Sequence, residues 1–410
     1  MATVRIKKLK PGMVLADDVY DIKGRLLMPR GKPIGPEHIR ILKIWGIPQV
    51  DIVGASEGGE ATPVPPDPLR VEAARQQAEQ LFVLTERDHP AIKEIFDQAV
   101  NYRAARSVPP PTDILPHEQP SAPDTAPKED FLAKLFEQDI ALPEIPSIVI
   151  ELNEVIANPF STADQMAQVI NKSPSLTAMM LKIVNSSFYG LPAKVDRVSL
   201  AVTLIGTREL SSLALGISIM SIFRSIPTSL MTMRSFLKHS LACGVLSRLL
   251  AAHKTLRQTE QMFTAGLLHD IGRLILFIYF PEDGLGTLRM ARKTTEPLYR
   301  AENRRLGCHH ARIGKCLLDR WRMPLIIENT VGFHHEPSEA PDPVPAAIVH
   351  VADLIVNALG IGTSGERLVP PLDARAWEAL EMSPSCFDLV IHQTIHQLNT
   401  LEFLLADNRP

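Results

Sequence analysis

The chain has 410 residues, of which 45% are hydrophobic and 5% aromatic, and a formal net charge of −3 at pH 7. That length has room for two or three domains with a large, chiefly aliphatic core. The near-neutral charge excludes the overall electrostatic attraction on which nonspecific nucleic-acid binding depends, so no nucleic-acid partner is expected.

The sequence shows no sign of export or of a membrane span. Its first residues, Met-Ala-Thr-Val-Arg-Ile-Lys-Lys, lack the apolar core of a signal peptide. No uninterrupted apolar stretch reaches the length of about 18 residues that a membrane span needs. The four cysteines form no CxxC pair, which indicates buried free thiols in a reducing compartment. We therefore expect a cytoplasmic protein that does not contact a membrane.

Residues 1–53 are predicted to form a small α+β module. Residues 9–16 and 24–28 resemble short strands punctuated by Pro and Gly turns, and residues 49–53 resemble a closing strand. Pro36 opens a helix between them. A module of this length buries little surface alone, so it should dock on a partner or on the rest of the chain.

Residues 54–129 are predicted to be Pro-rich linkers flanking a helical segment. Apolar residues recur at helical spacing from about 70 to 106, and Pro90 divides this stretch into two helices. Residues 108–127 hold seven prolines and cannot form a core. Both a spacer and a helix pair for partner docking or dimerisation fit this pattern.

Residues 266–273 read Gly-Leu-Leu-His-Asp-Ile-Gly-Arg, in which His269 and Asp270 interrupt a long apolar run. An ionised carboxylate buried in such a run without a partner costs several kcal/mol. Asp270 therefore needs a metal, a cation or dense hydrogen bonding, and the adjacent imidazole favours a metal.

Further candidate ligands precede and follow this pair in stretches with the periodicity of amphipathic helices. They are His239, His310, His334, His335 and Asp353. Imidazole nitrogens and carboxylate oxygens together suit Fe, Mn, Zn or Ni. One or two divalent ions are therefore expected, without thiolate ligands.

His239 lies on a predicted helix over residues 236–253, where it shares an apolar face with Cys243, Leu246 and Leu250. A lone histidine there would more often be a hydrogen-bonded core residue. Its place ahead of six more candidates favours a ligand.

Four other histidines are not interpreted as ligands. His350 is expected to pack or to hydrogen-bond, while Asp353 on the same helix face acts as the ligand. His309 is expected to be exposed beside its neighbour His310. His392 and His396 have i, i+4 spacing but no third ligand nearby, which favours surface or edge histidines.

Residues 363–410 complete the chain. A loop containing Gly and Pro is followed by two predicted helices, over residues 373–382 and 384–406. The second has an apolar stripe at helical spacing, so both should pack on the preceding domain.

Separated motifs agree in their order with one known domain. They are 142–146 (Leu-Pro-Glu-Ile-Pro), 170–176 (Ile-Asn-Lys-Ser-Pro-Ser-Leu), 185–190 (Asn-Ser-Ser-Phe-Tyr-Gly), 199–206, Leu318-x-x-x-Trp321-x-x-Pro324 and His350-Val-Ala-Asp353-Leu. With the order His, His-Asp, Asp they resemble the HDOD domain, the HD-related output domain of bacterial signalling proteins. The resemblance covers residues 130–362. It implies a mainly α, two-lobed fold, with a helical lobe over about 130–225 and an HD-like lobe over about 230–362.

The larger ligand set also resembles that of the HD-GYP phosphohydrolases, and residues 1–53 resemble a module that precedes some of them. After His334 and His335, however, the characteristic Gly-Tyr-Pro loop is absent, and Arg273 stands where a lysine is usual. Both departures disfavour cyclic di-GMP hydrolysis.

Two functional hypotheses follow from these resemblances. HDOD domains are regarded as non-catalytic relatives of HD hydrolases, which implies a signal-transduction output or scaffold protein with a protein partner; the complete ligand run implies that it still binds metal. The alternative is a metal-dependent phosphohydrolase of a nucleotide or phosphodiester, with Asp270 and Arg273 as catalytic residues and Arg273 neutralising a phosphate. A nucleotide ligand, a homodimer and a relic site without metal remain open alternatives.

Overall fold

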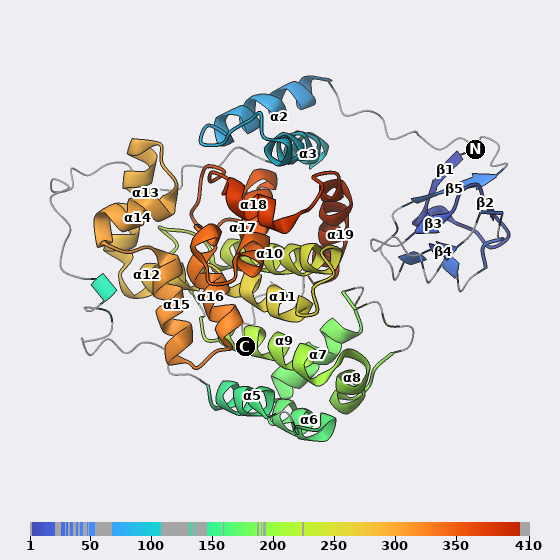
Figure 1. Ribbon diagram of the computed structural model, residues 1–410, viewed down its shortest axis with the longest axis horizontal. Helices are drawn as coiled ribbons and strands as arrows, with labels where there is room; N and C mark the ends of the chain where they lie inside the picture. Colours follow the sequence, from blue (N-terminus) through green and yellow to red (C-terminus); the bar gives the residue numbers. More distant parts are fainter. Residues whose placement is uncertain are drawn as a thin grey trace.

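The protein is mainly helical in the computed structural model, as the sequence predicts (Figure 1). The structure describes residues 2–20, 26–28, 30–31, 33–35, 38–39, 42–43, 47, 49–53, 68–106, 108, 131–132, 135, 146–158, 160–186, 188–189, 191, 194–223 and 225–401. The described helices of residues 68–401 form a body with a continuous apolar core, and the N-terminal strands have a core of their own.

The N-terminal module contains an antiparallel sheet in the order β1-β5-β2 and a β3–β4 pair. The elements are β1 (Ala2–Arg5), a 3-10 turn (Ile6–Lys8), β2 (Val14–Leu15), β3 (Val19–Tyr20), β4 (Leu26–Met28) and β5 (Gln49–Val53). Within the predicted strand at residues 9–16 only Val14 and Leu15 form a strand. A turn occupies the preceding positions, and Gly12 adopts a φ of +96° that favours glycine.

The core of this module shares no residue with the core of the helical body. Its buried side chains include Leu15, Met28, Ile34 and Leu42. Residues 38, 39, 42 and 43 are helical, whereas Pro36, the predicted start of that helix, lies outside the described residues.

The two helices predicted on either side of Pro90 are α2 (Pro68–Leu81) and α3 (Pro90–Arg106). They pack on each other, and α3 also packs on the C-terminal part of the body. Arg103 Nε donates a hydrogen bond to the Ala358 carbonyl at 2.8 Å, and the Val369 N–H donates one to the Leu81 carbonyl at 2.8 Å. This segment is therefore an integral part of the helical body.

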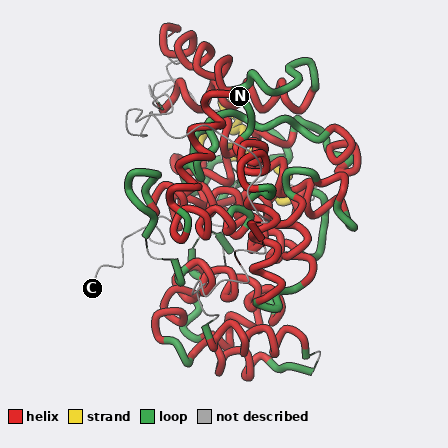
Figure 2. The backbone as a smooth tube through the Cα atoms, turned by 90° about the vertical axis from the view of Figure 1, so that its left-hand side faces the viewer, coloured by secondary structure: helices red, strands yellow, loops and turns green. Residues whose placement is uncertain are grey.

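The helical lobe follows in the chain and lies at the lower end of the body in Figures 1 and 2. It consists of α5 (Ser147–Ala157), α6 (Ala163–Asn171), α7 (Pro174–Val184), α8 (Val198–Ile205) and α9 (Thr207–Met220). Thr162 and Gln165 form a capping box that starts α6, because each side chain accepts a hydrogen bond from the other's backbone N–H.

The HD-like lobe follows the helical lobe in the chain, and α10 (Met233–His253) is its longest helix. Its other elements are α11 (Thr259–Leu268), α12 (Ile271–Tyr279), α13 (Pro281–Thr294), α14 (Leu298–Leu306), α15 (His310–Arg320), α16 (Leu325–Phe333), a 3-10 turn (Pro337–Glu339) and α17 (Pro343–Leu359). The segment Thr259–Tyr279 is long and apolar enough on average to cross a membrane, although charged residues interrupt its apolar run, and 89% of its apolar window is buried inside the body. Its apolar character is therefore that of a core segment.

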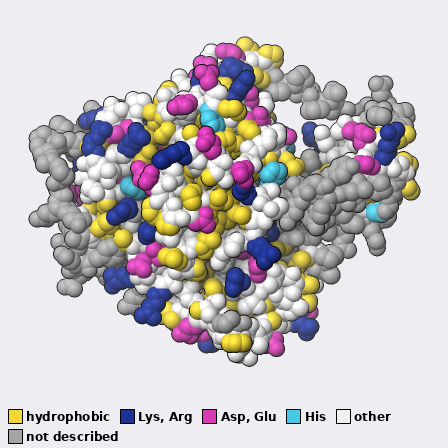
Figure 3. Space-filling model, in the orientation of Figure 1, with side chains coloured by type: hydrophobic (Ala, Val, Ile, Leu, Met, Phe, Trp, Pro, Cys, Tyr) yellow, Lys and Arg dark blue, Asp and Glu magenta, His cyan; other side chains and the backbone are white. Residues whose placement is uncertain are grey.

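The last helices close the body. They are α18 (Ala374–Leu380) and α19 (Cys386–Leu401), which pack on α17 and α10 respectively. Residues 402–406 of the second predicted helix lie outside the described residues. His392 and His396 are exposed, as expected. Figure 3 shows acidic and basic side chains intermixed over one face of the body.

Candidate metal centre

The fold brings all seven sequence-predicted ligands together in the HD-like lobe. His269 directly follows α11 and Asp270 directly precedes α12, so the His-Asp pair forms the corner between these helices. His239 comes from α10 and Asp353 from α17. The remaining three lie at helix ends: His310 is the first residue of α15, and His334 and His335 directly follow α16.

These seven side chains are buried. His239, His269, His310 and His334 are 0% exposed, and the most exposed of the seven, His335, is 7% exposed. Burying polar groups at this depth costs free energy unless each one finds a partner. The partners that they find are chiefly one another.

A first group of donor atoms surrounds His239. Its Nε2 lies 3.3 Å from His269 Nε2 and 3.2 Å from Asp353 Oδ1. His269 Nε2 and Asp353 Oδ1 are 3.5 Å apart. These three atoms therefore form a compact triangle of nitrogen and oxygen donors.

A second group surrounds His310. Its Nε2 lies 3.3 Å from His334 Nε2 and 3.0 Å from His335 Nε2. The ring of His335 is stacked on that of Tyr299, with centroids 4.3 Å apart and an interplanar angle of 13°. Tyr299 of α14 thus holds the most exposed of these imidazoles in place.

Asp270 connects the two groups through its two carboxylate oxygens. Oδ2 lies 3.0 Å from His269 Nε2, and Oδ1 lies 2.9 Å from His310 Nε2. The short contact between Oδ1 and His310 Nε2 does not have the geometry of a hydrogen bond. Among the described residues, no other group donates a hydrogen bond to this buried oxygen. A carboxylate in this position can bridge two cations.

Hydrogen bonds behind the imidazoles fix which nitrogen faces the centre. His269 Nδ1 donates to the Gly266 carbonyl at 2.8 Å, and His334 Nδ1 donates to the Val331 carbonyl at 2.8 Å. A carbonyl only accepts, so each Nδ1 carries a proton and each neutral ring directs its Nε2 lone pair inward. This is the orientation that metal-binding histidines need.

The donor set fits a divalent ion. A tetrahedral ion with metal–nitrogen and metal–oxygen bonds of about 2.0–2.2 Å holds neighbouring donor atoms about 3.3–3.6 Å apart. The first group has separations of 3.2 to 3.5 Å. Without a proton or a cation between them, the facing lone pairs of two imidazoles at 3.3 Å would repel each other.

The carboxylates control protonation throughout this cluster. Burial lowers the pKa of His269, but Asp270 and Asp353 outweigh it and raise that pKa to about 10. Burial raises the pKa of Asp270, but Arg273, His269 and His310 outweigh it and hold that pKa well below its usual range. Burial and neighbouring imidazoles hold the pKa values of His334 and His335 well below the usual range of histidine. In the absence of a metal, protons on some of these imidazoles therefore balance the carboxylate charge.

Arg273 lies beneath the His-Asp corner and is 2% exposed. Its Nη1 donates to Asp270 Oδ2 at 3.2 Å and to Ser364 Oγ at 2.6 Å, and its Nε donates to Glu302 Oε1 at 3.2 Å. The guanidinium therefore already has anionic partners inside the protein, and a role against a phosphate remains a prediction.

Comparisons with known proteins identify the domain that holds most of these residues. Residues 142–337 match the family model of the HDOD domain. This part of the chain is an HDOD domain. A protein of Treponema pallidum (strain Nichols), named only as uncharacterized, is 25% identical over 212 residues, which are 52% of this chain and 41% of that protein. The chain thus matches about two fifths of that relative's length.

Solved structures share the fold of this HDOD domain. An HDOD domain protein of unknown function from Geobacter sulfurreducens has a TM-score of 0.55 at 20% identity, and covers 67% of this chain and 97% of its own. A protein from Marinobacter aquaeolei, provisionally named a signal transduction protein, has a TM-score of 0.53 at 17% identity over 80% of this chain and 68% of its own. A protein from Shewanella amazonensis, provisionally named a phosphohydrolase, has a TM-score of 0.51 at 21% identity over 66% of this chain and 98% of its own.

Two further histidines lie near the ligands. His350 donates from Nδ1 to the His334 carbonyl at 2.8 Å and accepts at Nε2 from the Asp373 N–H at 3.1 Å, so it hydrogen-bonds as expected. The expectation that His309 is exposed is wrong. Its half-buried ring lies against Tyr299, His310 and His335, because the turn before α15 directs it toward them.

Sequence reasoning missed two residues beside the ligands. Glu302 of α14 contacts both His310 and Arg273, and nothing in the spacing of a single sequence indicates this. Cys243 Sγ lies 3.7 Å from His239 Nε2, although thiolates were not expected to take part. Its i, i+4 spacing from His239 on an apolar face was the available signal.

Proposed function

We propose that this protein is an output or scaffold protein of bacterial signal transduction, in which the HDOD domain binds a protein partner and a divalent metal fixes its helices. The burial of the candidate ligands carries this proposal. A hydrolytic metal needs a water and a substrate at an open coordination position. Donor atoms that are at most 7% exposed by residue do not offer a phosphodiester such access.

The origin of the ligands supports a structural role for the metal. They come from α10, the α11–α12 corner, α15, α16 and α17, which are segments far apart in the chain. An ion that binds donors from several helices locks their relative positions, and its binding free energy becomes part of the folding free energy. Such a site would keep the partner-binding surface in one conformation.

The second candidate function is hydrolysis of a nucleotide or phosphodiester, and the position of Asp270 favours it. The two oxygens of this carboxylate face two separate groups of donors, as in sites that hold a pair of metals. Bound metals would supply an activated hydroxide and polarise the phosphoryl oxygens. In this case Asp270 would hold the ions, and Arg273 would keep that carboxylate ionised and in position.

Metal analysis and an activity assay on the same samples separate these functions. The full chain, purified without a His-tag or chelator, should contain at least about one equivalent of a divalent transition metal. Chelation should lower its thermal midpoint, while a panel of nucleotides and bis(p-nitrophenyl) phosphate should show no turnover above background. The Asp270→Asn variant should lose metal, and Asp388→Asn, at a side chain that is 63% exposed, serves as its matched control.

Each other outcome has a defined meaning. Turnover that Asp270→Asn abolishes and Asp388→Asn retains would replace the scaffold function with the hydrolase. Less than one tenth of an equivalent of metal after reconstitution, with no effect of chelation, would overturn the metal in both functions.

A further inference from the structure

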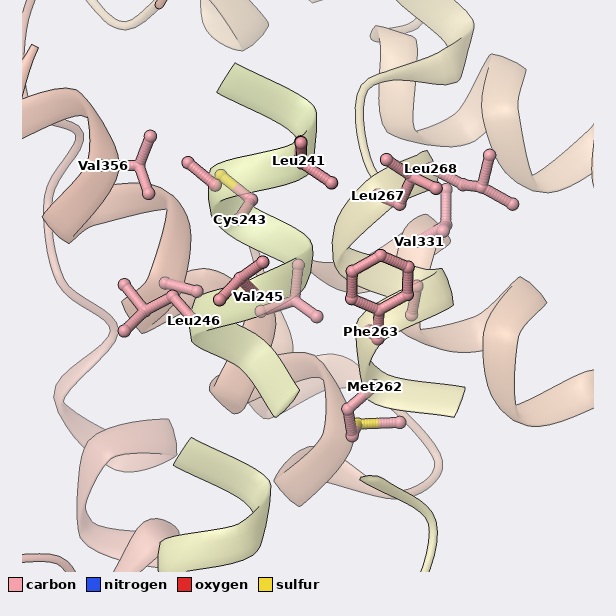
Figure 4. Close-up of a cluster of buried hydrophobic side chains, with 14 of the residues drawn as sticks. Leu241, Cys243, Val245, Leu246, Met262, Phe263, Leu267, Leu268, Val331 and Val356 are labelled. Atoms are coloured by element: carbon pink, nitrogen blue, oxygen red, sulfur yellow. The ribbon is translucent and has the colours of Figure 1, made fainter. Parts of the chain in front are cut away.

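Cys243 lies one helical turn after His239 and faces the same centre. It is 0% exposed, and its Sγ is 3.7 Å from His239 Nε2. Figure 4 shows its side chain projecting from α10 within the packed interior beside α11 and α17. The thiol therefore lies inside the HD-like lobe, next to the first group of donors.

Four donor atoms come together at this point. Cys243 Sγ, His239 Nε2, His269 Nε2 and one carboxylate oxygen of Asp353 all lie within 4.8 Å of one another. A tetrahedral zinc ion with a Zn–S bond of about 2.3 Å and Zn–N bonds of about 2.0–2.1 Å places sulfur about 3.6 Å from nitrogen and the nitrogens about 3.3 Å apart. In the protein, Cys243 Sγ lies 3.7 Å from His239 Nε2, and His239 Nε2 lies 3.3 Å from His269 Nε2.

Packing alone does not explain a thiol in this environment. A buried free cysteine usually behaves as a small apolar side chain. Here the thiol lies 3.7 Å from His239 Nε2 and within 4.8 Å of ligand atoms of His269 and Asp353, so its neighbours include potential metal ligands as well as apolar side chains. A thiol that coordinates an ion is deprotonated by it.

We propose that Cys243 is a thiolate ligand that, with His239, His269 and Asp353, completes a four-ligand site for a thiophilic divalent ion, of which Zn²⁺ is the best match. This inference rests on the proposed metal binding and adds a ligand to it. Binding forms the metal–sulfur bond, breaks the S–H bond and releases that proton to solvent, without a change of oxidation state. Thiolate ligation favours zinc over manganese or magnesium, which prefer oxygen donors.

The chemical consequence is a closed site. Four protein ligands leave a tetrahedral ion no position for water or substrate, and this distinguishes structural from catalytic zinc. Asp270 would direct its Oδ1 to the second group, where His310, His334 and His335 lie, while its Oδ2 stays 3.0 Å from His269 Nε2. The two halves of the cluster would differ in chemistry, with sulfur in only one of them.

X-ray absorption spectroscopy of the full-length, untagged protein loaded with one equivalent of Zn²⁺ tests this directly. The expected result is a sulfur neighbour at about 2.3 Å from zinc in addition to nitrogen and oxygen neighbours. The Co²⁺-substituted protein should show a thiolate-to-cobalt charge-transfer band. Both measurements use the wild-type chain, so they do not depend on the folding of a variant.

The variants Cys243→Ser and Cys386→Ser form a matched pair, because both thiols are buried and Cys386 lies on α19 outside the cluster. Cys243→Ser should lose the charge-transfer band and bind zinc at least about 10- to 100-fold more weakly, whereas Cys386→Ser should retain both properties. Zinc bound stoichiometrically with only nitrogen and oxygen neighbours would overturn the role of Cys243 and leave the proposed metal site intact. Absence of any bound metal would overturn both.

Discussion

Glu302 Oε2 accepts two hydrogen bonds from His310, one from the backbone N–H at 2.8 Å and one from Nδ1 at 2.5 Å. Its other oxygen accepts a hydrogen bond from Arg273 Nε at 3.2 Å. This single buried carboxylate therefore fixes the start of α15, the protonation of the His310 ring and the position of the arginine beneath Asp270. Carboxylates behind metal-binding histidines raise the basicity of the ring and hold its orientation.

Replacing Glu302 by Gln should weaken metal binding about 10- to 100-fold, because a neutral amide raises the basicity of the His310 ring less than a carboxylate does and holds its orientation less firmly. Competition with a chromophoric chelator measures this affinity. Glu339→Gln, at a side chain that is 63% exposed, is the control and should bind metal like the wild type. Equal affinities in the two variants would show that Glu302 has no influence on the metal.

Gly272→Ala should destabilise the protein by about 1–3 kcal/mol or more, because a Cβ at this position would force two helices apart. That atom would lie 2.0 Å from the His310 carbonyl oxygen and 2.8 Å from the Gly314 nitrogen, which are both backbone atoms. Urea denaturation measures the free energy of unfolding. Gly35→Ala, where the nearest atom is an ordinary 3.6 Å away, should change it little. An unchanged midpoint for Gly272→Ala would contradict this close packing of α12 on α15.

Metal affinity should rise as the pH increases from about 7 toward 10. Burial lowers the pKa of His269, but Asp270 outweighs it and raises that pKa to about 10, so the metal-free ring carries a proton that an ion must displace. Calorimetric titration in buffers of different ionisation enthalpy should show release of about one proton or more per ion at pH 7. A His392→Gln variant, which changes an exposed histidine, should release as many protons as the wild type. Affinity that is flat over this pH range would contradict the prediction.

The same pKa shift gives the metal-free protein the opposite pH dependence. A raised pKa means that the folded state binds the His269 proton more tightly than the unfolded state does. This contribution to stability is complete below the unfolded pKa of about 6.5 and is lost as the pH rises toward 10. Thermal unfolding of the chelated protein should therefore show a midpoint that falls over this window. The midpoint of the metal-loaded protein should fall less.

Arg248 connects the helical lobe to the HD-like lobe. Its guanidinium lies 4.2 Å from the centre of the Phe188 ring, its Nε donates to Glu260 Oε1 at 2.6 Å, and its Nη1 donates to the Phe188 carbonyl at 3.2 Å. Tyr189 donates to the other oxygen of Glu260 at 3.0 Å. The Phe-Tyr part of the motif at 185–190 thus contacts both α10 and α11, the helices that carry His239 and lead to His269.

Arg248→Met should cost about 3 kcal/mol, because it leaves the 4% exposed Glu260 with an unpaired charge. Denaturant unfolding measures the loss. Arg375→Met removes an ion pair in which the arginine is 74% exposed, and should cost no more than about 1 kcal/mol. Combining Arg248→Met with Glu260→Leu should recover part of the stability, because the unpaired carboxylate is gone. Equal losses for the two arginine variants would contradict a role for Arg248 in holding the lobes together.

The sequence by itself predicted the helical class, the two helices on either side of Pro90, the closing helices and the identity of the HDOD domain. Helical periodicity is a local property, and helix breakers such as Pro90 act on their immediate neighbours. The seven candidate ligands could be chosen because the order of the motifs resembles a known domain. The residue types of the ligands and their order can be recognised in the sequence even though the ligands lie on different helices.

Only the tertiary structure decided which side chains contact these ligands from other elements. Glu302 reaches His310 across the α14–α15 turn, and Arg273 is directed inward to Asp270 and Ser364 rather than toward solvent. The α2–α3 pair joins the main core, and the ring of His309 packs against Tyr299. Periodicity shows which face of a helix is apolar but not which helix covers that face. Contacts between residues distant in the chain depend on how the helices pack, and a single sequence does not record this.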